Sequence, residues 1–405
     1  MKLLKKKFVL LVPIIVFAVT LIFSLTLIPS VNPVPKKLPI AIVNEDQGIK
    51  ISGQVKMNLG EDIAQKIIHL SKSDKQPVAK WVKVKNQKLV HEGLNDRKYY
   101  AALIIPKDFS QKQATFQTKN PAAPKIHIVI NQGANTMAAN ASGQILNQVV
   151  ELINQNSRKQ ILTNFKKQGA SLTVEQASAI ASPVTSKVEN VNQTGSHSAN
   201  GNAPVSLIQP LWMSSLIGAV LIFLTARKIK CSSRTDALLS RVTQGLIGIV
   251  LAMITGYSIV WIANDWVGLS IPQMHETALF ITICYGCFYL MVSAVISWIG
   301  AGGAGIFGIL FFFGTPLLTI APEFMSTFYR DWFYPWLPMR FAADGLRDLL
   351  FFHKDLSLSQ PVSVLIWIGL VSFILLLASA SKRSVVCKEK GEAVHPIGMN
   401  PVETK

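Results

Sequence analysis

The sequence predicts an α-helical polytopic membrane protein with six transmembrane helices and an extracytoplasmic α/β domain between the first and second helices. Three observations lead to this fold class: the apolar composition, the long apolar segments and the basic residues at their ends. Of the 405 residues, 50% are hydrophobic and 15% are charged, and the mean hydropathy is +0.35. An ordinary soluble domain of this length is more polar than this.

Six apolar segments are candidates to cross a bilayer. A hydrocarbon core about 30 Å thick requires roughly 20 apolar residues in a helix, because the backbone polar groups must be satisfied within the segment. The segments are approximately Phe8–Ile28, Ser206–Ala226, Val242–Ala263, Ala278–Trp298, Ile306–Ile320 and Val362–Ala380. The fifth segment is short and contains Pro316, so its limits are soft.

The first segment follows a run of lysines and is longer than the core of a signal peptide. No clear small-x-small cleavage site follows it before Pro29. We interpret the segment as an uncleaved signal anchor, with a cleaved signal peptide as the alternative.

The basic residues predict the orientation of the chain. Lys and Arg near helix ends stay on the cytoplasmic side of a membrane. The basic segments are MKLLKKK, ARKIKCSSRTDALLSR and SKRSVVCKEK, and all three fall on one side if there are six spans. The loop NDWVGLSIPQMHET between the third and fourth spans has no Lys or Arg. Both termini are therefore expected in the cytoplasm, and residues 30–205 and a shorter loop at 321–361 are expected outside.

This orientation divides the chain into five parts. These are an N-terminal anchor (1–29), an extracytoplasmic α/β domain (30–182), a linker (183–205), a five-helix membrane domain (206–381) and a cytoplasmic tail (382–405). Within the membrane domain, residues 323–360 form an amphipathic segment on the outer side. The linker is assigned to SKVENVNQTGSHSANGNAPVS because it is polar and rich in Asn, Ser and Gly.

The predicted outer domain alternates strands and helices. Four compact runs rich in β-branched residues are typical of strands: LPIAIVN, VAKWVKV, YAALIIP and KIHIVIN. Apolar residues at helical spacing predict helices at NLGEDIAQKIIHL, at KLVHEGLN and from Thr136 to about Phe165. KDFS is expected to form a turn. The order strand, helix, strand, helix, strand, strand, helix favours a small α/β domain.

Several of these segments resemble a known family. LPIAIVNEDQG, NLGEDIAQKI, HEGLNDRKYYAALIIPKDFS and the helix after IVINQG are similar to the outer domain of the YhgE/Pip (phage infection protein) group. That group lies within the type-2 ABC exporter permease superfamily. A second similarity is WLPMRFAADGLRDLLFF, which resembles the Pro-rich segment before the last helix in that superfamily. The resemblance implies the permease half of an exporter, and its outer domain is shorter than in many members of the group.

The residues Asn44, Glu45 and Asp46 follow the first strand. A catalytic carboxylate pair requires an acid or base partner, and a metal site requires converging ligands, and neither lies nearby in the sequence. We expect these three side chains to shape the exit of the strand through bonds to the backbone. Contact with a ligand is the alternative.

The sequence also limits the kinds of chemistry. The net charge of +18 is split between inner flanks and the outer domain, without clustered aromatic residues, so nucleic acid is not an expected partner. A solvated basic face and attraction to anionic polymer or lipid headgroups are the two interpretations of the outer charge. Cys284 and Cys287 lie within a span and are expected to be small buried residues. We predict no enzymatic activity, no cofactor and no metal site.

A transporter needs an energy source. The chain has no G-x-x-x-x-G-K-[ST] phosphate loop, and the span centres have no Asp, Glu, Lys or Arg that could serve a proton relay. A separate ABC ATPase is therefore the expected partner, together with membrane lipid and a second permease copy in a homodimer or a heterodimer. The longest inner loop is the candidate docking surface for the ATPase, with a short capped helix at TDALLSR. Its charged residues are Arg227, Lys228, Lys230, Arg234, Asp236 and Arg241. A role limited to fixing topology is the alternative.

Two further segments are candidates for function. GAGGAGIFG joins the fourth and fifth spans and contains Gly300, Gly302, Gly303 and Gly305, which favours close helix packing or a hinge. The aromatic segment 323–360 suits the outer membrane interface. We expect it to form helices in which opposite charges pair across turns, and contact with a substrate headgroup is the alternative. Its candidate residues are Trp336, Pro338, Arg340, Asp344 and Arg347.

Two functional hypotheses follow. The first is an ABC exporter permease that moves an amphipathic or cell-envelope substrate with energy from a separate ATPase. The second is a membrane-anchored surface receptor or secretion accessory without transport activity. An ATP-hydrolysing partner recovered with the chain favours the first hypothesis.

Overall fold

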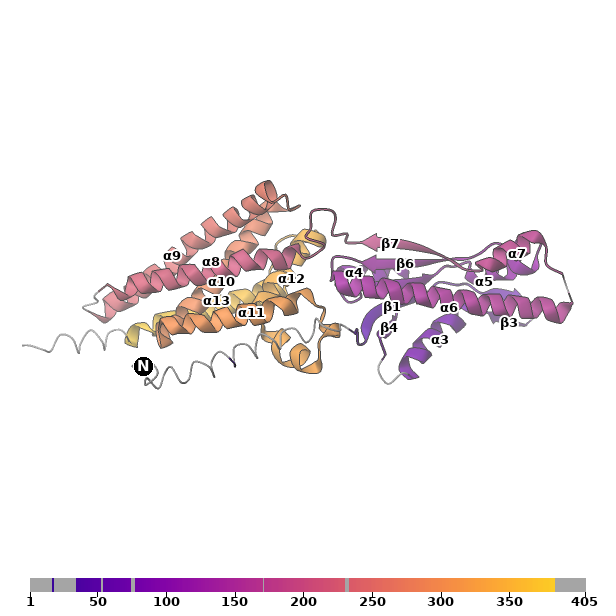
Figure 1. The fold of residues 1–405 in the computed structure, drawn as a ribbon, viewed down its shortest axis with the longest axis horizontal. Helices are drawn as coiled ribbons and strands as arrows, with labels where there is room; N and C mark the ends of the chain where they lie inside the picture. The colour runs from indigo at the N-terminus through magenta and orange to yellow at the C-terminus, as the bar shows by residue number, and fades with distance from the viewer. Residues whose placement is uncertain are drawn as a thin grey trace, which may run out of the picture. The chain divides into compact units, whose positions relative to one another are not determined.

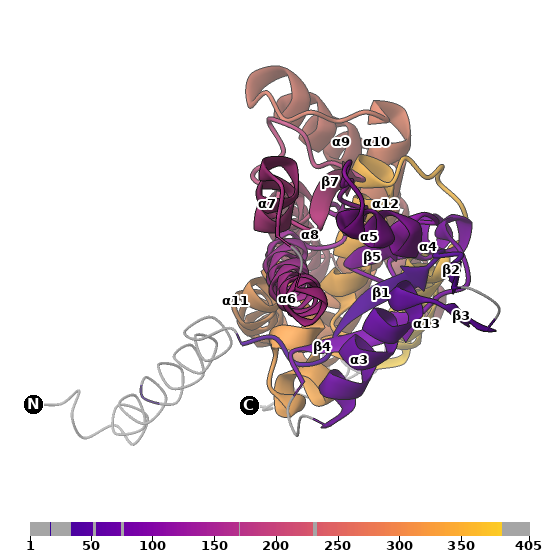
Figure 2. The same cartoon turned by 90° about the vertical axis from the view of Figure 1, so that its right-hand side faces the viewer.

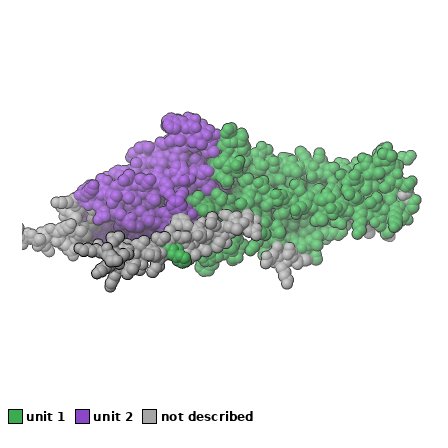
Figure 3. All heavy atoms as spheres, in the orientation of Figure 1, with its two compact units in different colours: residues 1–203, 315–337, 350–353 green, residues 204–314, 338–349, 354–405 purple. Residues whose placement is uncertain are grey.

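The computed structural model shown in Figure 1 describes residue 17 and residues 34–51, 54–73, 77–169, 171–229 and 233–382. The chain divides into two compact units, coloured separately in Figure 3. Unit 1 comprises residues 1–203, 315–337 and 350–353, and unit 2 comprises residues 204–314, 338–349 and 354–405. Apart from Phe17, the predicted first span lies outside the described residues, as does the tail after residue 382.

Unit 1 is built on a five-stranded mixed sheet with the order β4-β1-β5-β6-β7 (Figure 1). β1 is parallel to β4 and β5, β6 is antiparallel to β5, and β7 is parallel to β6. A separate antiparallel pair is formed by β2 and β3. The strands are β1 (Leu38–Asn44), β2 (Ile49–Ile51), β3 (Gln54–Met57), β4 (Ala79–Lys83), β5 (Ala101–Ile105), β6 (Lys125–Asn131) and β7 (Thr185–Val191).

Helices cover both faces of this sheet. They are α3 (Leu59–Ser73), α4 (Gln87–Asn95), α5 (Phe109–Ala114), α6 (Thr136–Gln168) and α7 (Val174–Ala181), with a 3₁₀ turn η1 (Thr115–Gln117) after α5. α3, α5 and α6 pack on the face that carries Ile40 and Ile42, and α4 packs on the face that carries Ala41 and Val43. The central strands are buried on both faces, and this accounts for the continuous apolar run LPIAIVN.

The predicted strands at Leu38–Asn44 and Lys125–Asn131 and the long helix from Thr136 are confirmed. The long helix begins where the Asn135 side chain accepts a hydrogen bond from the backbone N–H of Ala138 at 3.1 Å. It ends at Gly169, whose φ of 61° is a left-handed conformation that favours glycine.

The segment predicted as a linker differs from the expectation, because it contains β7. This strand pairs with β6 from Lys125↔Thr185 to Asn131↔Val191. Six of its seven side chains are exposed, so it is held by backbone hydrogen bonds at the edge of the sheet rather than by apolar burial. The predicted turn at KDFS is confirmed only for Lys107 and Asp108, because α5 begins at Phe109.

Residues 315–337 also belong to unit 1 and bond to residues that precede the central strands β1 and β5 and the helix α6. The Lys36 N–H donates to the backbone oxygen of Glu323 at 2.9 Å, and the Tyr100 hydroxyl donates to the Glu323 carboxylate at 2.9 Å. The Asn135 amide donates to the Thr319 carbonyl at 3.2 Å. Residues just before β1, β5 and α6 are therefore tied to a chain segment between 184 and 287 positions further on.

Unit 2 consists mainly of long apolar helices. Within the described residues, five stretches are long and apolar enough to cross a membrane: Ala203–Arg227, Arg234–Trp266, Met274–Ile299, Ala301–Thr319 and Gln360–Lys382. The corresponding elements are α8 (Ala203–Arg227), α9 (Arg234–Trp261) with η2 (Ile262–Trp266), α10 (Met274–Ile299), η3 (Ala301–Gly303) with α11 (Ala304–Thr319), and α13 (Gln360–Ala378). The last residues of α11, from Thr315 onward, fall in unit 1.

α10 is the most buried of these helices and packs against α9 and α13. The α9–α10 contact is close at Gly256, where an added Cβ would lie 2.1 Å from Thr282 Oγ1 and 2.7 Å from the Ala278 carbonyl oxygen. Large apolar side chains such as Leu221, Ile249 and Trp367 remain exposed on the outer surfaces of the helices. This distribution suits helices whose outer faces contact lipid.

Candidate functional site

The start of α9 and the ends of α10 and α13 meet at one end of unit 2. Ala237 at the start of α9 and Ala380 after α13 form a small buried cluster. The Lys382 ammonium donates to the Trp298 carbonyl at the end of α10 at 2.7 Å, and the Trp298 indole N–H donates to the Leu375 carbonyl at 3.0 Å. The loop between α8 and α9 therefore lies at the same end of the unit as the last residues of α10 and α13.

Most of the candidate docking residues are exposed at this end. Arg227, Lys228, Arg234 and Asp236 are all exposed to solvent, and Lys230 lies outside the described residues. Three of these four side chains are positively charged and one is negatively charged, and a surface with net positive charge can attract a negatively charged partner.

The predicted short helix at TDALLSR is instead the first part of α9, which runs unbroken from Arg234 to Trp261. Ser233 caps it: the Ser233 hydroxyl accepts from the Asp236 N–H at 3.1 Å, and the Asp236 carboxylate accepts from the Ser233 N–H at 3.1 Å. This capping box satisfies two N–H groups that a helix start otherwise leaves without a partner. A force applied to the loop would therefore act directly on the spanning helix.

Arg241 differs from the other residues of the docking set because it is buried. Its exposed fraction is 5%, and its guanidinium donates to the Gln244 side chain at 3.0 Å. The neighbouring Gln244 carbonyl accepts from the Tyr289 hydroxyl of α10 at 3.0 Å. Arg241 is therefore buried beside Gln244, a residue that α10 contacts, and is not part of the exposed surface.

The glycine-rich connection follows α10 at the same end of unit 2. Gly300 has a φ of 88°, which side chains with a Cβ rarely adopt, so this position requires glycine. A Cβ at Gly303 would lie 2.7 Å from Ile299 Cγ1, whereas a Cβ at Gly302 or Gly305 would meet no atom of the described chain within 4 Å. Close packing within the chain therefore applies to Gly303 and not to Gly302 or Gly305.

The outer amphipathic segment consists of short turns followed by one helix. The turns are η4 (Pro322–Phe324), η5 (Tyr329–Phe333) and η6 (Tyr334–Trp336), and the helix is α12 (Pro338–Phe351). Pro338 occupies the first position of α12, where its missing N–H costs nothing. Trp332 and Trp336 are 72% and 54% exposed, as suits aromatic side chains at a membrane interface.

A row of opposite charges follows one side of α12. Arg347 donates to Asp344 at 3.1 Å, and Arg340 lies 3.9 Å from the same carboxylate. Arg347 is only 7% exposed, and the Asp344 side chain is 23% exposed. A partly buried pair of this kind contributes little net stability, but removing one partner leaves an uncompensated charge.

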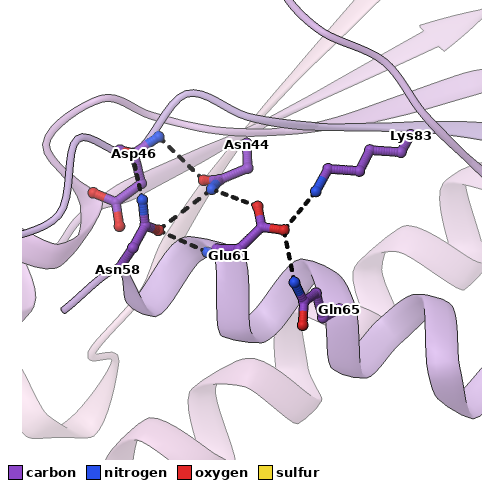
Figure 4. Close-up of polar contacts among 6 residues, drawn as sticks. All are labelled: Asn44, Asp46, Asn58, Glu61, Gln65 and Lys83. Carbon is purple, nitrogen blue, oxygen red and sulfur yellow. Dashed lines mark hydrogen bonds and ion pairs between the residues drawn. The ribbon is translucent and has the colours of Figure 1, made fainter. Parts of the chain in front are cut away.

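The residues after β1 connect three helices to the sheet, and Figure 4 shows the contacts of Asn44 and Asp46 around the start of α3. The Asp46 carboxylate accepts hydrogen bonds from the N–H groups of Gly60 at 3.1 Å and Ser110 at 3.0 Å, which are the second residues of α3 and α5. It also accepts from the Ser110 hydroxyl. The Glu45 carboxylate accepts from the N–H of Gln87, the first residue of α4, at 3.3 Å. Each carboxylate thus lies where helix dipoles favour negative charge.

Asn44 completes this cluster from inside the strand end. Its side-chain oxygen accepts from the Asp46 N–H at 3.1 Å, and its amide donates to Asn58 and Glu61 at 3.3 and 3.2 Å. Asn58 caps α3 by accepting from the Glu61 N–H at 2.7 Å. The Lys83 ammonium donates to Glu61, and this bond is the main cause that lowers the pKa of the Glu61 carboxyl. Hydrogen bonds to other groups of the protein therefore explain the position of each side chain in this cluster.

One known protein family matches a stretch of the chain that includes both the membrane helices and the α/β region. The family described as "ABC-2 family transporter protein" matches residues 7–380. The chain belongs to this family.

A curated relative supports the same placement for part of the chain. An uncharacterized protein, YhgE of Bacillus subtilis (strain 168), is 27% identical over 134 residues, which is 32% of this chain and 16% of the relative. The match thus spans about a sixth of that relative's length. No solved structure matches the chain.

Membership of the ABC-2 transporter family, together with the long apolar helices, makes the chain a multi-pass membrane protein. The family resemblance that the sequence predicted, to the YhgE-type group of ABC-2 permeases, is confirmed. The description of the family is that of a transporter protein. Among the described residues, no group of three or more His, Cys, Asp or Glu side chains could hold a metal ion.

Local sequence patterns did not reveal two features of the ABC-2 chain. The contacts of Glu323 with Lys36 and Tyr100 join residues more than 200 positions apart, and no periodicity indicates them. The role of Asp46 at two helix starts was also missed, although helix patterns beginning near Asn58 and Phe109 were a usable signal.

Proposed function

We propose that this chain is the permease subunit of an exporter that moves an amphipathic or cell-envelope substrate, with energy from a separate ABC ATPase. The observation that carries the proposal is the family match over residues 7–380, in a chain that has no phosphate-binding loop of its own. The same match favours a permease over a membrane-anchored receptor or secretion accessory.

The proposed orientation places both termini in the cytoplasm and residues 30–205 outside. It is supported by the basic residues around the α8–α9 loop and after α13, which belong to one end of unit 2. Six spans require that the segment Phe8–Ile28 also crosses the membrane, and its length and apolar composition support this.

The ATPase is proposed to dock on the exposed residues of this basic end. Arg227, Lys228, Arg234 and Asp236 supply the surface, and Lys230 extends it along the loop. The unbroken α9 supports transmission of ATPase motion into the membrane, because its first turn belongs to the docking surface. The glycines at 302 and 305 leave space at the same end for a hinge or for a neighbouring helix of a second permease copy, in a homodimer or heterodimer.

The outer segment is proposed to lie at the membrane interface and to contact lipid or a substrate headgroup. The exposed tryptophans of its turns and the charges of Arg340, Asp344 and Arg347 on α12 support this position.

The experiment that tests the docking proposal is purification of the full chain from its own membranes in mild detergent, followed by an ATPase assay. We expect ATP hydrolysis to accompany the wild-type chain. The double substitution R227E/R234E is expected to remove that activity while the protein still inserts and elutes normally. The control K107E/K119E changes an equal charge in unit 1 and is expected to keep the activity. Recovery of a stable chain that never carries ATPase activity would contradict the proposal.

A further inference from the structure

Unit 1 contains a cavity that the proposed function does not use. It has a volume of about 920 Å³ and lies between α3, β4, α5 and α6 on one face of the sheet. Its floor includes Ala79, Trp81, Phe109 and Ile153. This volume is within the range of about 300–1,000 Å³ that is typical of sites for small molecules. We name this cavity the α3–α6 groove.

The groove exists because two helices cover the same sheet face without packing closely on each other. α3 lies over β1 and β4, whereas α6 lies over β5, β6 and β1, and the two helices diverge from each other (Figures 1 and 2). Ile63 and Ile67 of α3 and Ile145 and Val149 of α6 all face the groove and are only half-buried. Two apolar helix faces thus remain available to a further apolar group.

The mouth of the groove is also apolar. Leu70 of α3 is 71% exposed and Leu152 of α6 is 56% exposed, and both line the cavity together with Val78. Covering such side chains contributes about 25 cal/mol for each Å² of apolar surface removed from water. Contiguous exposed apolar surface around a cavity marks a binding site more often than scattered residues do.

The polar groups of the lining indicate what kind of ligand fits. The Ser71 hydroxyl donates to the Ala79 carbonyl at 2.7 Å, and the Gln113 amide donates to the Pro183 carbonyl at 2.8 Å, so both are engaged by the protein backbone. Asp62 and Lys66 are exposed at the rim of the groove, and their opposite charges lie one helical turn apart. A peptide on this apolar floor would leave backbone N–H and C=O groups without partners, whereas a hydrocarbon would not.

The length of the groove matches a lipid chain. The α3 wall from Leu59 to Leu70 is about 17 Å long at 1.5 Å per residue. One leaflet contributes about 15 Å, half of the roughly 30 Å hydrocarbon core of a bilayer. The far wall on α6 changes from apolar at Ile145 and Val149 to polar at Asn156 and Gln160.

We propose that the α3–α6 groove binds the hydrocarbon chain of an amphipathic lipid, with its polar end toward Asn156 and Gln160. Such a site deepens the proposed function, because it specifies that the amphipathic substrate carries a long hydrocarbon chain. It rests on the proposed function only for the step in which the bound molecule is exported. Binding itself requires neither the ATPase nor transport.

The test uses the full chain in detergent-free nanodiscs, since detergent tails would compete for the groove. A diazirine-labelled palmitic acid is added, irradiated and located by mass spectrometry of peptides. We expect saturable labelling of peptides covering residues 59–71 and 145–160. V149W, which fills the groove, is expected to lower the labelling by at least about tenfold, because methylene groups of the chain lose their buried positions.

Two further variants keep the result interpretable. L70D places a charge at an exposed mouth position, where folding is not at risk, and is also expected to reduce labelling. V174W adds the same side chain at an 81% exposed position of α7 outside the groove, and is expected to leave labelling unchanged. Equal labelling of wild type, L70D and V149W, or labelling confined to the helices of unit 2, would overturn the proposal.

A protein occupant gives a different outcome. With the photoreactive amino acid p-benzoylphenylalanine at Leu70, a product of twice the chain mass would assign the groove to a second copy and overturn lipid binding. If the wild-type chain shows no fatty-acid labelling of the groove but still carries ATPase activity, this inference alone is refuted. Labelling without any ATPase would instead refute the docking proposal and leave the groove in place.

Discussion

The hydrogen bonds of Asp46 lead to a prediction about the stability of the α/β region. The carboxylate is 7% exposed and accepts bonds from the N–H groups of Gly48, Gly60 and Ser110, as well as from the Ser110 hydroxyl. Asp46→Ala leaves these donors buried without their acceptor. Because hydrogen bonds to a charged group contribute about 1.5–3 kcal/mol each and do not add fully, we expect a loss of roughly 3–5 kcal/mol.

The assay is hydrogen exchange of the full chain, followed at the first turns of α3 and α5. A loss of this size accelerates exchange there by two or more orders of magnitude, since about 1.4 kcal/mol corresponds to a factor of ten. The control Asp96→Ala removes an exposed carboxylate that bonds Lys98 on the surface, and it is expected to change exchange by less than tenfold. Unchanged exchange in Asp46→Ala would refute the structural role. Normal exchange with lost export would mean that Asp46 contacts a ligand.

Three further predictions follow from the same contacts. Arg347→Ala is expected to lower the thermal stability of the detergent-solubilised chain because it removes the 3.1 Å partner of Asp344, whereas the triple substitution R340M/D344L/R347M is expected to restore much of it because all three charges of the row are removed; equal losses in both variants would contradict this. The pKa of the Glu61 carboxyl is lower in the folded state than its ordinary value of 4.5, so the ionised carboxylate stabilises the fold above that pH. Wild type is therefore expected to protect the α3 amides from exchange better than Glu61→Gln does at pH 7, and to lose this advantage as the pH falls through the lowered pKa. A difference between the two proteins that grows in acid would exclude this stabilising role. Gly256→Ala is expected to lower the yield of monodisperse protein because the Cβ would overlap α10, whereas Gly302→Ala is expected to match wild type in the same elution assay; the reverse order would show that the α9–α10 contact is wrong.

The membrane class could be predicted because it depends on composition and on long apolar segments, whereas the family was indicated by the resemblance of motifs such as LPIAIVNEDQG. A run of about 20 apolar residues has few alternatives to a spanning helix, and the five described helices follow the predicted segments closely. The central strands were predictable for a similar reason, since burial on both faces leaves a continuous apolar run at Leu38–Asn44.

The features that local patterns missed are those fixed by long-range contact. β7 reads as a polar linker because its side chains remain exposed, and only its backbone pairing with β6 makes it a strand. The inclusion of residues 315–337 in unit 1 depends on bonds such as that from Tyr100 to Glu323. The α3–α6 groove likewise arises from the angle between two helices, which no single segment encodes.

The side-chain roles were predicted less completely than the fold. Arg241 belonged to a basic run, and only the packing of α9 on α10 separates it from its exposed neighbours. The NED segment was predicted to bond to the backbone at a strand exit, but its partners on α3, α4 and α5 come from three separate stretches of the chain.

The most direct test of the central proposal is the accessibility of single cysteines in intact cells. In a variant without the four native cysteines, Asn120→Cys and Thr235→Cys place exposed thiols in the α/β region and at the basic end of unit 2. A membrane-impermeant maleimide is expected to label Asn120→Cys in intact cells and Thr235→Cys only after the membrane is opened. Labelling of Thr235→Cys in intact cells, with Asn120→Cys protected, would place the proposed ATPase surface on the wrong side of the membrane and contradict the account.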